Sequence, residues 1–444
     1  MSFVNTPGVQ VTETSLLPPS IVQVSTAIPV FMGYTAKGEI GKPVRITSIN
    51  DFENNFGKGY AYKFGVTKDA SGVFTATAPT YDLFFYEAIR LYFLNGGGAC
   101  YILPVNHHET EDTPGTFLKN SPKVGDFTDW VSDIEKMDEP TLIAFPEAAS
   151  LTKANYQTLV NLAIGVCENT MDKFTLVDVP NELDALKLAE RNDFRGLITA
   201  NASYAAAYYP ALETVLNVNV NEAGITLTGG TMPGTSSADY QALMAAIQKV
   251  TGLTVPPSAL IAGVYAKVDR DNGVWKAPAN VGLQGVIKPV QAISDDEQGL
   301  LNVDATAGKS INAIREFTGK GTIVWGARTL DGNSNEWRYV PVRRLFITVE
   351  ESIKKATSQF VFENNDAKTW VKVSAMIKSY LNGLWKEGAL MGASAEDAYF
   401  VQVGLGTTMT QEDILEGKMK VKVGLAAVRP AEFIILEFSH FMNQ

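Results

Sequence analysis

The middle of the chain alternates short apolar runs with amphipathic segments, and this alternation constrains the fold most strongly. Apolar runs at residues 141–145 and 174–179 predict strands, and the segment 155–166 between them predicts a helix. Another helix is predicted over residues 81–94, where apolar side chains recur at helical spacing before three glycines. A strand, a helix and a second strand at this spacing are typical of a parallel sheet. We therefore predict the α/β fold class, with mixed α+β character.

The composition argues against several classes of protein. The 444 residues carry a net charge of −11, which argues against nucleic acid as the main partner. Two cysteines and three histidines cannot supply a disulfide framework or a Cys/His zinc site, and we predict that His107 and His108 form a solvated loop pair. No apolar run approaches the roughly 20 residues of a membrane span. We expect no stable membrane insertion, no secretory signal, no cofactor and no metal site.

The charge is unevenly placed along the chain. Residues 335–444 contain 13 basic and 13 acidic side chains, whereas residues 1–334 contain 24 basic and 35 acidic ones. A neutral C-terminal part can approach copies of itself or a charged partner without much repulsion, and an acidic remainder suits a solvated outer surface. Compositional scatter is an equally good explanation of the difference.

Residues 1–30 differ from the rest of the chain and predict an extended arm. They hold one charged residue, Glu13, and four prolines. Short apolar pieces separated by prolines cannot form a compact unit alone, so they need an existing sheet edge to pair with. A core strand over residues 27–34 follows. The short alternating pieces of the arm contain Val9, Val11, Ile21, Val22 and Val24.

The C-terminal part predicts two long helices and then strands. Residues 345–360 and 366–385 show helical periodicity, and residues 399–403 predict a strand. Three lysines at 418, 420 and 422 alternate with apolar residues and predict a half-exposed strand. A last apolar strand is predicted over residues 432–441, where it presents an open sheet edge. Its apolar positions include Phe433, Ile435, Leu436 and Phe438.

Three segments resemble ligand-binding motifs, but each lacks a required residue. Residues 307–310 (AGKS) resemble the end of a phosphate-binding P-loop, yet Val303 stands where that loop requires glycine. Residues 404–409 lack the third glycine of a dinucleotide motif. Residues 269–273 resemble a calcium loop without its glutamate, and a tight acidic turn is the better interpretation. The three incomplete motifs weaken the case for an enzyme, but they do not exclude catalysis by carboxylate side chains.

Ten segments, in order along nearly the whole chain, resemble the tail sheath proteins of contractile phages and of phage-tail-like injection systems. The most specific lie between residues 269 and 345 and include GVWKAPAN at 273–280 and VWGARTL at 324–330. Flanking segments include PVRITSINDFENNFG at 43–57 and RPAEF at 429–433. Two polar, glycine-rich stretches near 57–79 and 217–238 depart from the family pattern. We interpret them as surface insertions.

The resemblance implies a multi-domain sheath-protein fold and no catalytic residues. Its parts are an extended N-terminal arm (1–30), an outer α/β region of one or more domains (31–334), a C-terminal inner α/β domain (335–429) and a C-terminal β-arm (430–444). Sheath subunits polymerise as stacked six-membered rings around an inner tube, and their arms add strands to a neighbour's sheet. A baseplate signal triggers contraction, which drives the tube through a target envelope.

The same resemblance implies partners and a place of action. The partners are further copies of the chain, an inner tube protein, and baseplate and terminal cap proteins. Assembly takes place in the bacterial cytoplasm, within a phage tail or a released extracellular tail-like particle. The residues predicted to contact neighbouring subunits are the arm positions Val9, Val11, Ile21, Val22, Val24, Phe433, Ile435, Leu436 and Phe438.

Two charged groups of side chains have alternative interpretations. Lysines on the exposed face of the helix over 366–385 are predicted to touch an acidic inner tube, although a solvated face explains them as well; they are Lys368, Lys372 and Lys378. Arg328, Arg343 and Arg344 invite a binding role, but we favour an intramolecular ion-pair network. An α/β enzyme of unknown substrate and a surface adhesin-like module remain the alternative functions.

Overall fold

The computed structural model describes residues 20–113 and 116–433, which form two compact units. Unit 1 consists of residues 20–24 and Val349–Val428. Unit 2 consists of Ser25–Thr348 and residues 429–433. Helix α9 (Val340–Thr357) belongs to unit 2 in its first half and to unit 1 in its second. None of the helices in the described part of the chain has the length and apolar character needed to cross a bilayer.

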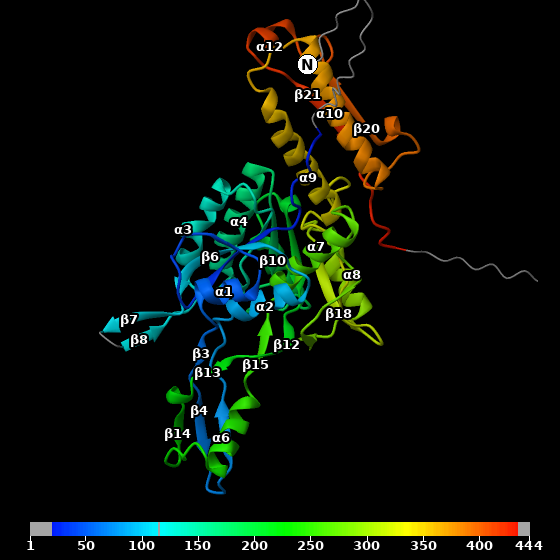
Figure 1. The fold of residues 1–444 in the computed structure, drawn as a ribbon. Helices are drawn as coiled ribbons and strands as arrows, with labels where there is room; N and C mark the ends of the chain where they lie inside the picture. Colours follow the sequence, from blue (N-terminus) through cyan, green and yellow to red (C-terminus); the bar gives the residue numbers. More distant parts are fainter. Residues whose placement is uncertain (1–19, 114–115, 434–444) are drawn as a thin grey trace, which may run out of the picture. The chain divides into compact units, whose positions relative to one another are not determined.

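Unit 2 is built on a nine-stranded mixed sheet (Figure 1). Six neighbouring strands run parallel, and the strands beyond them at either edge run antiparallel to their neighbours. This confirms the predicted α/β fold class. In spatial order the strands are β16 (Val281–Gly282), β19 (Gly321–Val324), β18 (Ile311–Phe317), β11 (Ala205–Tyr209), β10 (Phe174–Asp178), β9 (Leu142–Ala144), β1 (Pro29–Thr35), β6 (Cys100–His107) and β2 (Val44–Ile46).

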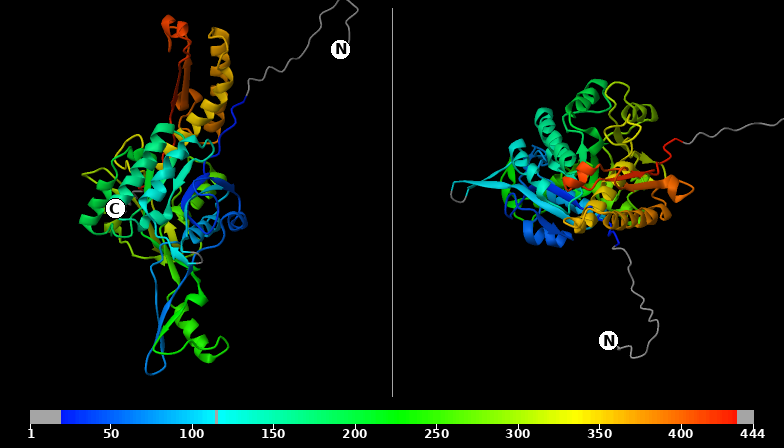
Figure 2. Two further views of the ribbon diagram at one scale, coloured as in Figure 1. Left: turned by 90° about the vertical axis from the view of Figure 1, so that its left-hand side faces the viewer. Right: turned by 90° about the horizontal axis from the view of Figure 1, so that it is seen from above.

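The central strands are buried and mostly apolar because helices cover both faces of the sheet. Every residue of β1 and of β10 is buried. On one face pack α2 (Phe85–Leu94) and α7 (Ser258–Asn272), and on the other pack α3 (Val124–Val131) and α4 (Lys153–Thr170) (Figures 1 and 2). The other helices of this body are α1 (Ile49–Phe56), α5 (Leu188–Leu197) and α8 (Asp295–Asn302).

Helix α2 shows how local contacts override periodicity. The sequence predicts a helix from residue 81, but α2 begins at Phe85. The hydroxyl of Tyr62 donates to the Leu83 carbonyl at 3.1 Å and accepts from the Leu83 amide at 2.9 Å. These bonds hold residue 83 outside the helix. Gly33 of β1 then lets the helix approach, because a Cβ there would lie 2.3 Å from the Phe85 ring.

The two polar stretches predicted to be surface insertions pair with each other. Strand β3 (Ala61–Tyr62) runs parallel to β13 (Asn219–Val220), and β4 (Gly65–Lys68) lies between β14 (Thr226–Thr228) and β5 (Phe74–Thr77). Helix α6 (Ala238–Gln248) packs on β5. We call residues 57–79 and 217–248 the paired module. Figure 1 shows it below the nine-stranded sheet.

The paired module holds apolar side chains that are shielded from solvent. Tyr62, Phe64 and Val66 are buried at 1–2 % exposure. The prediction of a simple surface excursion was therefore incomplete, because the two halves cover each other. A second sheet of three strands adjoins the module: β15 (Gly252–Val255), β12 (Leu212–Asn217) and β17 (Val286–Pro289). The hairpin β7 (Glu109–Thr113) and β8 (Thr116–Lys119) projects from the body of unit 2 in Figures 1 and 2.

Unit 1 packs helix α10 (Ala367–Lys386) against a two-stranded sheet. The sheet consists of β20 (Tyr399–Val403) and β21 (Val421–Leu425), and the unit also contains the second half of α9 and two short helices, α11 (Ala395–Ala398) and α12 (Gln411–Leu415). Helix α10 buries a stripe at helical spacing, as its sequence predicts. The buried residues of the stripe include Val373, Ile377, Leu381 and Leu384.

The predicted lysine-bearing strand begins later than expected. Strand β21 starts at Val421, after Lys418 and Lys420. The Lys420 ammonium lies 2.6 Å from an Asp413 carboxylate oxygen, and the Lys418 amide donates to the Asp413 carbonyl. These contacts hold residues 418–420 against helix α12, so the prediction was wrong for this part of the strand.

The division between the units falls at Val349, whereas the sequence places the start of the C-terminal domain at residue 335. Residues between these points contact unit 2. The Val340 amide donates to the Ala327 carbonyl, and the Thr329 hydroxyl donates to the Trp337 carbonyl at 2.8 Å. The first half of α9 is thereby part of the α/β body.

Candidate functional site

The carboxyl ends of the parallel strands are the usual ligand site of an α/β sheet, and here a protein carboxylate fills that site. Glu147 follows β9 and is fully buried. Its two oxygens accept hydrogen bonds from the amides of Tyr34 at 2.8 Å and Phe85 at 2.9 Å. Phe85 begins α2, so Glu147 takes the position that a ligand anion would take at the helix N-terminus. Burial raises the pKa of Glu147 to about 8, although these hydrogen bonds oppose the shift.

Asp178 occupies the N-terminus of helix α7 in the same way that Glu147 occupies that of α2. It ends β10, is buried, and accepts a hydrogen bond from the Ser258 amide at the start of α7, at 2.9 Å. Burial raises its pKa to about 7. The two helices on this face of the sheet therefore direct their N-termini at carboxylates of the chain itself.

The polar groups of the P-loop-like segment (residues 303–310) also make their contacts within the chain. Asp304 accepts from the amides of Thr306 at 3.1 Å and Ala307 at 2.9 Å, which in a true phosphate loop would face a ligand. The Lys309 ammonium donates to the Arg195 carbonyl at 2.7 Å, at the end of α5. Neither the backbone amides nor the lysine is directed at an external anion.

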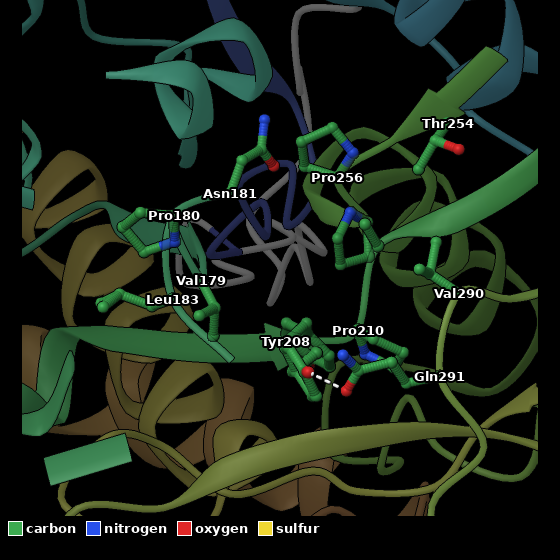
Figure 3. Close-up of a pocket in the computed structure, with 13 residues that line it drawn as sticks. Val179, Pro180, Asn181, Leu183, Tyr208, Pro210, Thr254, Pro256, Val290 and Gln291 are labelled. Atoms are coloured by element: carbon green, nitrogen blue, oxygen red, sulfur yellow. Dashed lines mark hydrogen bonds between the residues drawn. The ribbon is translucent and has the colours of Figure 1, made fainter. Parts of the chain in front are cut away.

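A pocket of about 220 Å³ lies beside these strand ends (Figure 3). Its polar groups are amides and hydroxyls, such as Asn181, Thr254 and Gln291, and none of its lining residues in the described chain carries a carboxylate, an ammonium or an imidazole. The Tyr209 hydroxyl lies within hydrogen-bond distance of both Gln291 and Asp184, to one of which it donates its single proton, and burial raises its pKa above the usual range. The pocket thus lacks a group suited to acid–base catalysis near neutral pH.

The two adjacent histidines differ from the prediction of a solvated pair. His107 ends β6, and the His108 ring is buried with Nε2 3.2 Å from the Tyr34 carbonyl. Burial lowers the pKa of His108 to about 4, so it is neutral at physiological pH. Within the described ranges, no three His, Cys, Asp or Glu side chains converge where a metal ion would fit.

The sequence 269–273, predicted to be a tight acidic turn, is instead the last turn of α7 and its glycine cap. Helix α7 runs to Asn272, and Gly273 ends it with a φ of +92°. The Asp269 carboxylate lies 2.6 Å from the Arg344 guanidinium. This aspartate therefore serves an internal ion pair.

The predicted arm residues lie partly within the described chain. Val22 is 81 % exposed, Ile21 and Val24 are half-buried, and residues 20–28 form no strand. Phe433 is 69 % exposed. The remaining predicted arm positions lie outside the described residues; they are Val9, Val11, Ile435, Leu436 and Phe438.

The sheet of unit 1 has two open edges among the described residues. β20 and β21 pair antiparallel with each other, and neither has a second neighbour there. An isolated pair of strands leaves a row of unpaired backbone N–H and C=O groups on each outer side. Such a sheet is suited to accept additional strands.

The three lysines predicted to face an inner tube are exposed on helix α10.

The three arginines predicted to form an internal network make internal contacts. Arg328 pairs with Glu432 at 2.6 Å and Arg344 pairs with Asp269 at 2.6 Å. Arg343 lies 3.8 Å from the centroid of an aromatic ring. The ion-pair interpretation is confirmed for Arg328 and Arg344.

Comparison with known families decides the identity of the fold. The model of the phage tail sheath protein central domain matches residues 125–330, and that of the phage tail sheath C-terminal domain matches residues 333–440. The chain belongs to the phage tail sheath protein family. Its solved neighbours are structural sheath proteins, so this sheath-family chain is a structural protein rather than an enzyme.

Solved sheath structures are similar over the full length of the chain. The sheath of the PVC extracellular contractile injection system, in its contracted state, is 35% identical with a TM-score of 0.69, and the match covers 99% of this chain and 98% of that one. The contracted helical sheath of the anti-feeding prophage is 34% identical with a TM-score of 0.67, covering 98% of this chain and 99% of that one.

Curated sheath proteins of phages are more distant. The tail sheath protein of Vibrio phage KVP40 is 24% identical over 306 residues, which are 67% of this chain and 43% of that protein. The chain therefore spans less than half the length of this relative.

Sequence reasoning missed Glu147, Asp178 and Glu432, because their partners lie far along the chain and no local spacing marks them.

Proposed function

We propose that this protein polymerises as stacked hexameric rings around an inner tube and contracts to drive that tube through a target envelope. The observation that carries this proposal is the match to the PVC sheath, a contracted sheath similar to this chain from end to end. A structure of the anti-feeding prophage baseplate contains a chain 34% identical to this one, which supports contact with a baseplate. Tube and cap proteins complete the proposed set of partners.

Strand exchange between copies would hold the polymer together. Among the described residues the β20–β21 sheet has two open edges, and both terminal arms of the sequence contain short apolar alternations. Two of the described arm residues, Val22 and Phe433, leave most of their surface in solvent in a single chain. We infer that arms of neighbouring copies add strands to this sheet, which satisfies the edges and covers the apolar side chains.

The energy for contraction would come from a difference between two packings of the polymer rather than from a bound nucleotide. The chain's own carboxylates take up the backbone amides that would otherwise hold a phosphate. Extended arms suit such a change of packing, because they keep neighbouring subunits connected while the rigid parts of those subunits move to new contacts.

Helix α10 is the proposed contact with the inner tube. Its lysines at 368, 372 and 378 are exposed, and an acidic tube surface would attract them. The proposed place of action is a phage tail or a released tail-like particle that assembles in the bacterial cytoplasm.

Electron microscopy of the purified full chain tests the proposal. We expect hollow cylinders or stacked rings with six-fold symmetry, whereas a monodisperse monomer at high concentration would contradict it. Deletion of residues 1–25 should abolish the polymer while the α/β body keeps its helical circular dichroism. Cylinders formed by the deleted chain would contradict the role of the N-terminal arm.

A further inference from the structure

The roots of both terminal arms are held by buried arginines. We propose that Arg344 and Arg328 are positioning residues that fix the points where the N-terminal and C-terminal arms leave unit 2. This inference rests on the proposed function, because a fixed root matters only if the arms connect copies. It concerns residues within one chain, so it can be tested before any polymer forms.

The N-terminal root is residue 26. The Thr26 carbonyl accepts hydrogen bonds from the Arg344 guanidinium at 2.8 Å and from the Thr141 hydroxyl at 2.9 Å. The same guanidinium donates to both oxygens of Asp269, at 2.6 and 3.0 Å, and lies 4.5 Å from the centroid of the Tyr265 ring. The side chains of Arg344 and Asp269 are 3 % and 4 % exposed. The carboxylate therefore holds the arginine, and the arginine holds the backbone of the arm.

The C-terminal root is Glu432. Its carboxylate accepts from Arg328 Nε at 2.9 Å and from another guanidinium nitrogen at 2.6 Å, which is a two-pronged contact. Asn302 donates to it at 2.7 Å and the Tyr339 hydroxyl at 3.1 Å. The Arg328 side chain is 5 % exposed and that of Glu432 is 22 % exposed. Three side chains of unit 2 thus converge on one side chain of the arm.

Arginine suits this task better than lysine does. Its planar group can bind a carboxylate with two parallel bonds and keep further donors for backbone carbonyls. Arg328 uses them on the carbonyls of Asn302 at 3.2 Å and Gly332 at 3.4 Å. Phe433 follows Glu432 directly and is 69 % exposed, so a held side chain and a largely exposed one are neighbours in the chain. Tension on the arm would reach the body through this pair.

The test uses the full chain with a fluorophore on Ala431→Cys. Both native cysteines, Cys100 and Cys167, are buried, so the label reports on the root alone. In the monomeric fraction, Glu432→Gln should lower the fluorescence anisotropy of the label while the circular dichroism spectrum shows that the α/β body remains folded. In assembly assays, the unlabelled Glu432→Gln chain should form cylinders at least tenfold more slowly. The matched control is Asp295→Asn, which breaks an ion pair of the same unit with Arg315 and should change neither readout.

The N-terminal root is tested by Arg344→Lys, which keeps a positive charge beside Asp269 and loses the fork that reaches Thr26. Its control is Arg315→Lys. Faster proteolysis at residues 20–28 in the monomer, together with slowed assembly, is the expected result. Unchanged anisotropy and unchanged assembly in Glu432→Gln would overturn the proposal for Arg328. If the parent chain forms no cylinders at all, the proposed function fails, whereas the anisotropy measurement still decides whether the root is held.

Discussion

Phe400 and Gly424 face each other across the two strands of unit 1 as a register pair. The aromatic ring covers the glycine so closely that a Cβ at position 424 would lie 2.1 Å from a ring carbon. Phe400 is still 45 % exposed on its other side. The ring thus stabilises a strand position that has no side chain of its own.

Gly424→Val should displace this ring and loosen the sheet that is proposed to accept the arms. Overpacking of this kind costs about 1–3 kcal/mol. We expect faster hydrogen exchange in peptides of β20 and β21 and fewer cylinders in electron micrographs. Gly282→Val is the matched control, because this strand glycine has open space around it. Normal exchange and normal cylinders in the Gly424 variant would show that the pair is unimportant.

Buried carboxyl groups should make the stability of unit 2 depend on pH. The pKa of Glu147 is raised from 4.5 to about 8, so the folded state holds its proton more tightly than the unfolded state does. The stabilisation is complete below about 4.5 and is lost as the pH rises through about 8, at up to about 1.4 kcal/mol per pH unit. Glu87 and Asp178, raised to about 7, act in the same direction.

The Glu147→Gln variant isolates the contribution of Glu147 to the pH dependence of stability. Urea unfolding between pH 5 and pH 8 should show a shallower decline of stability in the variant than in the parent chain. The variant should also be less stable at low pH by about 1–3 kcal/mol, because the amide group replaces an acceptor of a backbone hydrogen bond. Parallel pH profiles for the two proteins would contradict the assigned shift.

The two halves of the paired module should lose structure together. Phe64 is buried, and its carbonyl accepts from the Thr226 amide across the two insertions. Phe64→Ala should cost about 3–5 kcal/mol locally. Hydrogen exchange should then rise both in β4 and in β14, which are more than 150 residues apart in the sequence, while β10 stays protected. A rise confined to one half would refute the interdependence.

Charge reversal on helix α10 should separate tube attachment from sheath formation. The triple change to glutamate at Lys368, Lys372 and Lys378 should leave cylinders intact but reduce tube-filled particles at least tenfold, because an acidic tube would repel the helix. A triple reversal at exposed lysines of unit 2 (Lys37, Lys249 and Lys320) alters the net charge equally and serves as the control. Equal tube filling in both variants would exclude this face.

Elements with strong periodicity could be predicted closely. The helix predicted over 366–385 is α10 at Ala367–Lys386, and the strand predicted over 27–34 is β1 at Pro29–Thr35. In both, the apolar residues that identify the element lie within that one segment, so its own sequence is enough to predict it.

Features that depend on distant partners could not be predicted. The insertions look polar because each supplies only half of a small core, as Phe64 and Thr226 illustrate. His108 looks like a loop residue because nothing nearby in the sequence marks its burial against β1. Glu432 and Asp269 lie 104 and 75 residues from their arginines, so their roles become visible only in the fold.

A high-resolution cryo-EM map of the assembled protein tests the central claim most directly. We predict that strands from the terminal arms of neighbouring copies flank β20 and β21, with Glu432 still bound to Arg328 of its own chain. A lattice in which each terminus pairs only within its own copy, or the absence of any lattice, would contradict the account.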